Sequence, residues 1–256
     1  MSAARLDTRP NVIRLATMVV VLVAWEAVAR SNLLYAGVVP PLEAIAAALF
    51  ELVTGAAFYH HLAVTAFEVG LGIAIAAVAG IAAGILFGAR RFLGRAAEPY
   101  IVALATTPKI IFLPIVMLMF GIGIHSKTAL GALSGFFPVV LSTIDGMREI
   151  RPVHIQVGRS FNCSPLQMVR MIYLPALTGP ILTGLRLGLG VTLIGVLLAE
   201  IKISKAGLGF LANDLYSRFE IPELYALLIA IFLCAVLINE AMTGASRRFD
   251  PGGVRL

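Results

Sequence analysis

Two basic side chains lie inside long apolar stretches of this 256-residue chain, where a charge needs an explanation. They are Lys109, next to Pro108, and Arg186, and each is a candidate pathway residue. A charge at the centre of a bilayer costs about 2.5–3.5 kcal/mol on insertion scales. Lys109 is predicted either to attract an anion or to extend to the membrane interface. Arg186 is predicted either to find a partner within the protein or to contact a ligand.

The other reactive side chains show no catalytic or metal-binding pattern. Cys163 and Cys234 have different surroundings and no C-x-x-C spacing, so we predict two free thiols. The sequence has no P-loop, which excludes ATP hydrolysis by this chain, and no nucleophile elbow or zinc-protease motif. No metal or other cofactor is expected, because none of the histidines has carboxylates or thiols at metal-ligand spacing: His60, His61, His125 and His154.

The composition predicts an integral membrane protein. Hydrophobic residues make up 59% of the chain, charged residues only 13%, and the mean hydropathy is +0.94. Soluble domains are about 45–50% apolar and about 25% charged, so this chain has too little polar surface for water. The net charge of +6 is attributed to cytoplasmic loops rather than to nucleic-acid binding.

The apolar blocks predict an all-α fold with about six membrane spans in a single domain, residues 1–256. The spans are expected at residues 12–29, 62–88, 100–120, 127–143, 176–198 and 223–242. Gly80 and Gly84 form a G-x-x-x-G that permits close helix packing. Pro108 and Pro114 predict a kinked third span. After Pro40-Pro41, apolar residues at helical spacing predict a short surface helix.

The distribution of Lys and Arg predicts the orientation, because cytoplasmic loops carry the excess. The loops of one side hold thirteen: Arg5, Arg9, Arg14, Arg90, Arg91, Arg95, Arg148, Arg151, Arg159, Arg170, Arg247, Arg248 and Arg255. The other side holds five: Arg30, Lys127, Lys202, Lys205 and Arg218. Both termini and the segment 145–175 are therefore expected in the cytoplasm, with the chain in a bacterial inner membrane.

The polar segment 145–175 reads as two short helices joined by a turn. Pro152 is placed to start a helix through Phe161, and Ser164-Pro165 resembles an N-cap followed by proline at the first helical position. Asn162 lies between them and tolerates the left-handed conformation that ends helices. Within the second helix, one face is predicted to hold Leu166, Val169, Ile172 and Tyr173.

This segment resembles the cytoplasmic loop of bacterial ABC importer permeases, which reads E-A-A, three residues, G, nine residues, I, one residue, L-P. Here the corresponding residues are Gln156-Val157-Gly158, Asn162, Ile172 and Leu174-Pro175, with the same spacing. Gln replaces Glu, Val-Gly replaces Ala-Ala, and Asn replaces Gly. Further segments are similar to nitrate/sulfonate/taurine-type permeases: Thr107-Pro108-Lys109, Phe120-Gly121-Ile122-Gly123, Gly184-Leu185-Arg186-Leu187, Ala199-Glu200 and Gly207-Leu208-Gly209-Phe210.

The resemblance implies a type I importer fold and several partners. These are two cytoplasmic ATPase subunits that use ATP and Mg, an extracytoplasmic binding protein on segments 32–59 and 201–222, a second copy of the chain, and membrane lipid. The resemblance assigns ATPase coupling to Gln156, Val157, Gly158, Arg159, Ser160, Phe161, Asn162, Cys163, Ser164, Ile172, Leu174 and Pro175. The solute it implies is a small anion such as a sulfonate, taurine or nitrate.

The acidic residues help to distinguish an importer permease from other classes of membrane protein. Glu26, Glu68 and Glu200 are placed near span ends and expected to be solvated, and Glu240 is expected to oppose Arg247 or Arg248. An ion-gradient-driven secondary transporter or channel is the rival hypothesis, and it predicts internal repeats and acids in mid-span. The sequence shows no convincing repeat and no acid predicted in mid-span. An intramembrane enzyme would need a Ser/His or Asp pair within the spans.

Overall fold

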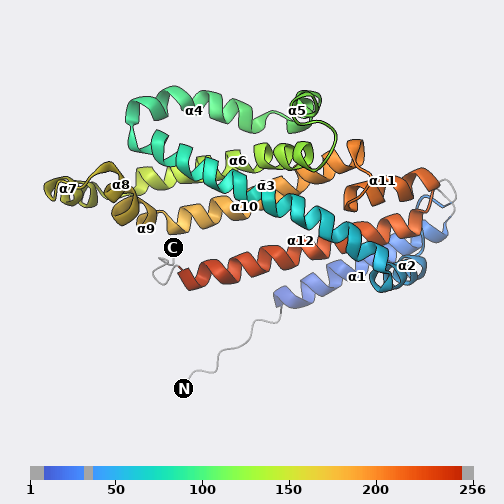
Figure 1. Cartoon of the computed structure of the whole chain (residues 1–256). Helices are drawn as coiled ribbons and strands as arrows, with labels where there is room; N and C mark the ends of the chain where they lie inside the picture. The colour runs from blue at the N-terminus through green and yellow to red at the C-terminus, as the bar shows by residue number, and fades with distance from the viewer. Residues whose placement is uncertain (1–8, 32–36, 250–256) are drawn as a thin grey trace, which may run out of the picture.

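In the computed structural model, which describes residues 9–31 and 37–249, all the regular structure is helical (Figure 1). The elements are α1 (Arg9–Arg30), α2 (Leu42–Thr54), α3 (Ala56–Ala89), α4 (Arg91–Thr106), η1 (Lys109–Phe112), α5 (Leu113–Phe120), α6 (Ile124–Glu149), α7 (Pro152–Ser160), α8 (Pro165–Met168), η2 (Val169–Tyr173), α9 (Leu174–Ala176), α10 (Thr178–Ile203), α11 (Leu208–Arg218) and α12 (Ile221–Phe249).

Five helices are long and apolar enough to cross a membrane, namely α1, α3, α6, α10 and α12. They confirm five of the six predicted spans, although most are longer than predicted. The longest, α3, has 34 residues. Its length is about 51 Å at 1.5 Å per residue. A bilayer core is only about 30 Å thick, so α3 must tilt or extend beyond it.

The third predicted span is corrected by the structure. Residues 100–120 do not form one kinked helix. Two helical segments, Phe92–Thr106 and Lys109–Phe120, meet at an angle of 92°. The break falls at Thr107 and Pro108, where both residues have extended backbone. Proline lacks the N–H that would continue the helix and keeps the preceding residue extended, so the chain turns there. Of the three arginines predicted in the loop before this span, only Arg90 lies between helices, because Arg91 and Arg95 belong to α4.

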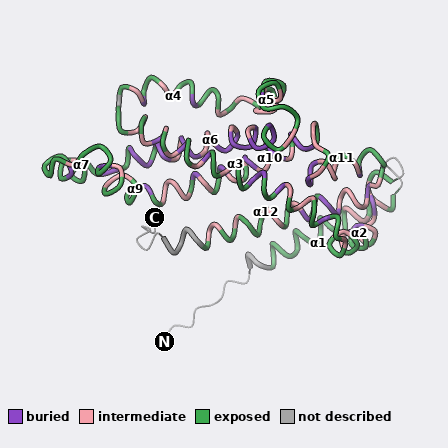
Figure 2. The backbone as a smooth tube through the Cα atoms, viewed as in Figure 1, coloured by how far each residue is buried: buried purple, intermediate pink, exposed green. Residues whose placement is uncertain are grey.

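The central layer of the protein consists of α3, α6 and α10, and α6 is the most enclosed of the spans (Figure 2). Small residues allow these helices to approach closely, as the G-x-x-x-G predicted. A Cβ on Gly80 would lie 2.8 Å from Val139 Cγ1, and one on Gly84 would overlap Thr143. Between α6 and α10, a Cβ on Gly188 would lie 3.1 Å from the Gly135 carbonyl oxygen.

The helices α1, α2 and α12 lie along one side of this layer (Figure 1). Trp25 fastens α1 through its Nε1, which donates to the Pro40 carbonyl at 3.1 Å. Glu26 accepts a hydrogen bond from the Leu42 N–H at 3.0 Å and so caps α2, the predicted surface helix. On α2, Ile45 and Ala48 are buried, whereas Phe50 is exposed.

The two ends of the molecule differ in what they carry. The segment α7–α9 lies at one end, where α3 finishes and α12 finishes, and α2 and α11 lie at the opposite end (Figure 1). This separation agrees with the predicted alternation of loops, in which segment 145–175 is on the side opposite to segments 32–59 and 201–222.

Candidate functional site

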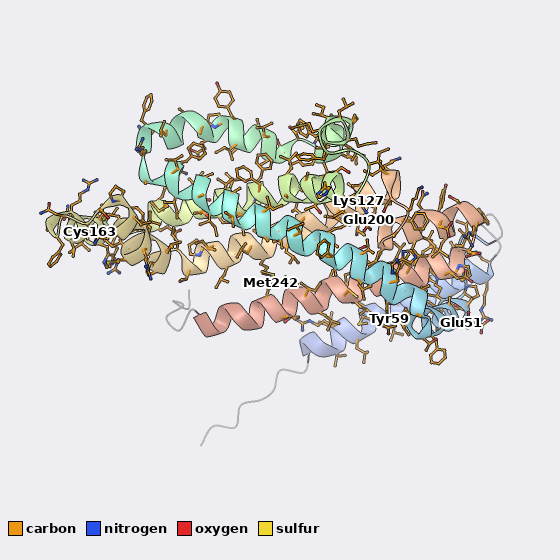
Figure 3. All side chains as sticks on the ribbon, viewed as in Figure 1. Glu51, Tyr59, Lys127, Cys163, Glu200 and Met242 are labelled. Carbon is orange, nitrogen blue, oxygen red and sulfur yellow. The ribbon has the colours of Figure 1, made fainter. Side chains whose placement is uncertain are left out.

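The segment predicted to couple to an ATPase projects beyond the long helices at one end of the protein, where Cys163 is labelled in Figure 3. Its first helix, α7, begins with Pro152 at the first helical position. It ends at Ser160, whose hydroxyl donates to the Gln156 carbonyl at 3.0 Å. The predicted helix from Pro152 is therefore confirmed, ending one residue before Phe161.

A tight, fully hydrogen-bonded turn follows α7. Asn162 has a φ of +51°, which confirms the predicted left-handed residue. The Asn162 N–H donates to the Arg159 carbonyl at 2.9 Å, and the Cys163 N–H donates to the Gly158 carbonyl at 3.0 Å. This pair of bonds is the Schellman motif, which satisfies the carbonyls at a helix end. The turn is consequently defined by its own backbone.

The next helix starts immediately with a capping box. The Gln167 N–H donates to Ser164 Oγ at 3.3 Å, and the Ser164 N–H donates to Gln167 Oε1 at 2.8 Å. With Pro165 at the first helical position, this confirms the predicted start. The chain continues through α8, the π-helical stretch η2 and α9, which contains Leu174-Pro175. Adjacent caps on both helices make the segment a stiff helical hairpin.

The two arms of the hairpin meet at Gly158. A Cβ there would lie 2.5 Å from Met168 Sδ and would overlap Ile172 Cδ1. Gly158 is therefore the small packing residue that the resemblance implies. The predicted apolar face is partly wrong, since Leu166 is 75% exposed and Met168 is buried in its place. The cause is the π-helical turn at Val169–Tyr173, which changes the period on which the prediction relied.

An apolar stripe remains uncovered on α7. Val153, Val157 and Phe161 are four residues apart and so share one face. They are 52%, 49% and 78% exposed. In a segment outside the spans, a continuous apolar stripe of this kind is typical of a protein contact.

The two predicted pathway cations have different surroundings. The Lys109 ammonium donates to the Ala105 and Thr107 carbonyls at the end of α4 and lies 4.9 Å from the centre of the Phe137 ring. Its contacts are thus with the break between α4 and η1. Arg186 lies on α10, and its Nε donates to Asn239 Oδ1 of α12 at 2.7 Å.

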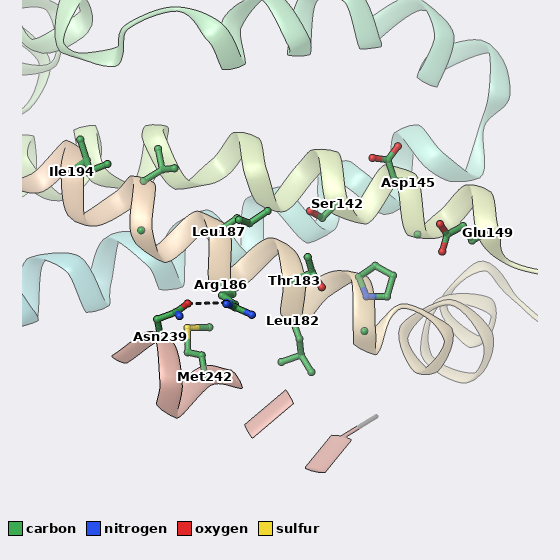
Figure 4. A pocket seen from close by; sticks show the side chains of 15 residues that line it. Ser142, Asp145, Glu149, Leu182, Thr183, Arg186, Leu187, Ile194, Asn239 and Met242 are labelled. Atoms are coloured by element: carbon green, nitrogen blue, oxygen red, sulfur yellow. Dashed lines mark hydrogen bonds between the residues drawn. The ribbon is translucent and has the colours of Figure 1, made fainter. Parts of the chain in front are cut away.

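Arg186 lines a cavity of about 1120 Å³ between α6, α10 and α12 (Figure 4). Ser142 and Thr183 also line it, and Asp145 and Glu149 lie at its end nearest α7. No carboxylate among the described residues forms an ion pair with Arg186. Arg186 is exposed, so its guanidinium faces this cavity while bonded to Asn239.

The predicted solvation of Glu68 and Glu200 is wrong, because both side chains are fully buried. Lys127, predicted in an outer loop, lies inside α6 and forms an ion pair with Glu68 Oε1. We call Glu68, Lys127 and Glu200 the buried charge cluster (Figure 3 labels Lys127 and Glu200). The sequence signal was that Glu68 lies six positions inside the predicted span 62–88. Glu26 stays partly exposed, and the partners expected for Glu240 have side chains outside the described ones: Arg247 and Arg248.

Comparison with known proteins identifies the class. Residues 72–253 match the family model described as "Binding-protein-dependent transport system inner membrane component". The taurine transport system permease protein TauC of Escherichia coli is 28% identical over 249 residues, which cover 95% of this chain and 90% of TauC. The nitrate import permease protein NrtB of Synechocystis is 31% identical over 173 residues, covering 68% of this chain and 63% of NrtB.

A solved structure supports the same fold. The chain superposes on a chain of the inward-facing MetNI methionine ABC transporter with a TM-score of 0.61, at 18% identity, covering 81% of this chain and 97% of that one. The fold is thus that of a type I ABC importer permease. This chain belongs to the binding-protein-dependent transport system inner membrane component family. It is a multi-pass inner-membrane protein and the permease subunit of an ABC importer.

Proposed function

We propose that this permease moves a small anion into the cytoplasm and is driven by separate ATPase subunits that grip the α7–α9 hairpin. The observation that carries the proposal is the exposed stripe Val153, Val157 and Phe161 on the first arm of a hairpin whose turn is capped on both sides, at the end of α7 and at the start of α8. A lever must be stiff to transmit force and must offer a surface to the motor. The hairpin has both properties, with its caps supplying the stiffness.

The proposal includes two further partners, a second copy of the chain and a binding protein. A second copy of the chain supplies the other wall of the pathway, and a binding protein delivers the solute to segments 32–59 and 201–222. The ATPase subunits use ATP and Mg, and this chain binds no cofactor. Both termini and segment 145–175 face the cytoplasm. The charge asymmetry of the loops supports this orientation.

The proposed solute class is a small anion, such as a sulfonate, taurine or nitrate. Two relatives are named for taurine and nitrate transport. Arg186 lines its cavity and forms no ion pair with a described carboxylate, which supports an anionic ligand, since the planar guanidinium suits oxyanions. The rival, an ion-gradient-driven transporter, gains one argument from the buried Glu68, because acids within spans are typical of that class. Uptake by this chain alone in vesicles with an ion gradient would establish the rival.

The coupling role predicts a sharp contrast at Asn162. Asn162→Pro removes the N–H that bonds Arg159 and cannot adopt a φ of +51°, so the hairpin loses its turn. We expect normal membrane insertion and at least a tenfold loss of ATPase co-purification or of ATP-driven uptake. Gln156→Arg is expected to act in the same direction. The measurements are pull-down of the ATPase and uptake in proteoliposomes.

Asn162→Gly is the matched control, because glycine adopts left-handed φ without strain. It should retain near-normal coupling. Phe161→Asp tests the surface rather than the turn and should weaken ATPase binding while leaving the fold intact. Normal uptake by both Asn162→Pro and Phe161→Asp would contradict the proposal.

The pathway role predicts that Arg186→Gln reduces anion uptake about tenfold or more. Glutamine keeps a hydrogen bond to Asn239 within reach but removes the charge in the cavity. ATPase stimulation by the loaded binding protein should persist, because the hairpin is unchanged. Lys109→Met serves as the comparison, since Lys109 mainly caps α4. A larger loss of uptake in Lys109→Met than in Arg186→Gln would move the anion site to Lys109.

A further inference from the structure

The segment before α11 is held to the span bundle by an unusual series of side chains. Three consecutive backbone N–H groups, at residues 207–209, each donate to a side chain of another helix. The Gly207 N–H donates to His61 Nδ1 at 3.0 Å, and the Leu208 N–H donates to Thr65 Oγ1 at 2.8 Å, both on α3. The Gly209 N–H donates to Glu200 Oε2 of α10 at 2.7 Å.

The buried charge cluster joins this anchor to the central helix. The Thr65 hydroxyl donates to Glu200 Oε1 at 2.7 Å, so it links the α3 and α10 contacts. The Lys127 ammonium of α6 pairs with Glu68 of α3 and also donates to Ser204 Oγ at 2.9 Å. Ser204 in turn binds the backbone of Ala206. Residues 204–209 are therefore bonded to α3, α6 and α10 at once.

The local sequence is shaped to let Glu200 reach this place. Gly207 has a φ of +112°, which side-chain-bearing residues rarely adopt. A Cβ on Gly209 would lie 2.8 Å from Glu200 Cβ and 2.5 Å from the Leu197 carbonyl oxygen. Two glycines thus remove the side chains that would push α11 away from the carboxylate. Glu200 also places a negative group at the N-terminus of α11, where the helix dipole favours it.

Buried charges of this kind are a poor way to gain stability alone, because burying an ion pair costs about as much as the pair returns. Such groups instead specify one relative position of the elements they join. Here the elements are an outer helix and all three helices of the central layer, which would have to move together in transport.

We propose that the buried charge cluster, acting with Thr65, is a rigid link through which docking of the binding protein on α11 is transmitted to α3, α6 and α10. This inference rests on the proposed function, in which segment 201–222 faces outward. Glu200 and Thr65 are positioning residues, because they act through α11 and touch no solute.

The test uses the complete importer, with ATPase subunits and loaded binding protein, in proteoliposomes. In Glu200→Gln an NH2 group replaces one carboxylate oxygen. That group then faces either the Thr65 hydroxyl or the Gly209 N–H, both of which donate to the carboxylate in the wild type. We expect basal ATPase activity within about twofold of the wild type and at least a tenfold loss of stimulation by the binding protein. Thr65→Val, which removes the bridging hydroxyl, should give the same pattern. Thr65→Ser keeps the hydroxyl and should be stimulated normally, as should Glu240→Gln, an exposed acid of α12.

A covalent link separates tethering from other effects. The facing rings of His61 and Phe210 have centroids 5.8 Å apart. In a chain with Cys163 and Cys234 replaced by serine, His61→Cys and Phe210→Cys are bridged by a short bifunctional thiol reagent. The bridge should restore stimulation of the ATPase activity by the binding protein in the Glu200→Gln variant. The bridged chain that keeps Glu200 should also be stimulated.

Two outcomes overturn the inference alone: normal stimulation of both Glu200→Gln and Thr65→Val, or no restoration after the bridge has formed. Absence of stimulation in the wild-type importer overturns the proposed function and this inference with it. Because the basal ATPase activity and the bridged variants are measured in parallel, misfolding of a single variant leaves the other arms decisive.

Discussion

Replacing Lys127 by methionine is expected to prevent most of the expressed molecules from folding. Methionine fills a similar volume but leaves Glu68 buried without its cation, in the same cluster as the buried Glu200. Removing one partner from a buried ion pair costs about 3–5 kcal/mol, because the other charge remains in a low-dielectric environment. That is a large share of a typical total stability of about 5–15 kcal/mol. The folded yield, measured by size-exclusion chromatography in detergent, should fall at least tenfold.

Two companion variants make the prediction specific. Lys202→Met removes an exposed lysine near the end of α10 and should leave the yield unchanged. The double change Lys127→Met with Glu68→Met replaces the pair by apolar side chains and should recover much of the yield, since well-packed apolar pairs often equal buried ion pairs. A full yield from Lys127→Met alone would show that the carboxylates do not need this cation.

The second large effect is expected at Gly84, where α3 crosses α6. A Cβ at this position would overlap Thr143 and lie 3.1 Å from the Val140 carbonyl oxygen. Backbone atoms cannot move aside as the end of a long side chain can, so Gly84→Leu must force the helices apart. We expect a cost of about 3 kcal/mol, at the upper end of overpacking penalties. The melting temperature in detergent should fall, with a marked loss of folded protein.

Gly70→Leu is the matched control on the same helix. No atom lies within 4 Å of the Cβ it would gain, and the residue is exposed. Its melting temperature should stay close to that of the wild type. Equal destabilisation by the two leucines would mean that helix propensity, and not the contact between α3 and α6, determines the effect.

Much of the architecture could be predicted because it depends on local patterns. Span positions follow from runs of apolar residues, which need no knowledge of neighbours. The hairpin was predictable for the same reason: Pro152, Asn162 and Ser164-Pro165 act on backbone within a few residues of themselves. The spacing from Gln156 to Pro175 then indicated the family, which the match over residues 72–253 shows.

The errors share a different cause. Whether two prolines kink a span or break it depends on what satisfies the freed backbone groups. Here Lys109 caps the end of α4, and the chain turns by 92°. The exposure of Leu166 follows from a π-helical turn that no local signal announced. Both predictions assumed that one helical period continues, whereas the helix breaks at Thr107 and Pro108 and changes to a π-helix at Val169–Tyr173.

The amino-acid sequence alone was sufficient for the membrane class, for the number of apolar segments and for the caps of the hairpin, because each depends on residues adjacent in the chain. Only the tertiary structure could show that Glu68, Lys127 and Glu200 meet, since 59 and 73 positions separate these neighbours and each lies in a different helix. Because burying a charge is costly, each buried charge needs a partner. Which residue becomes that partner depends on how the helices pack.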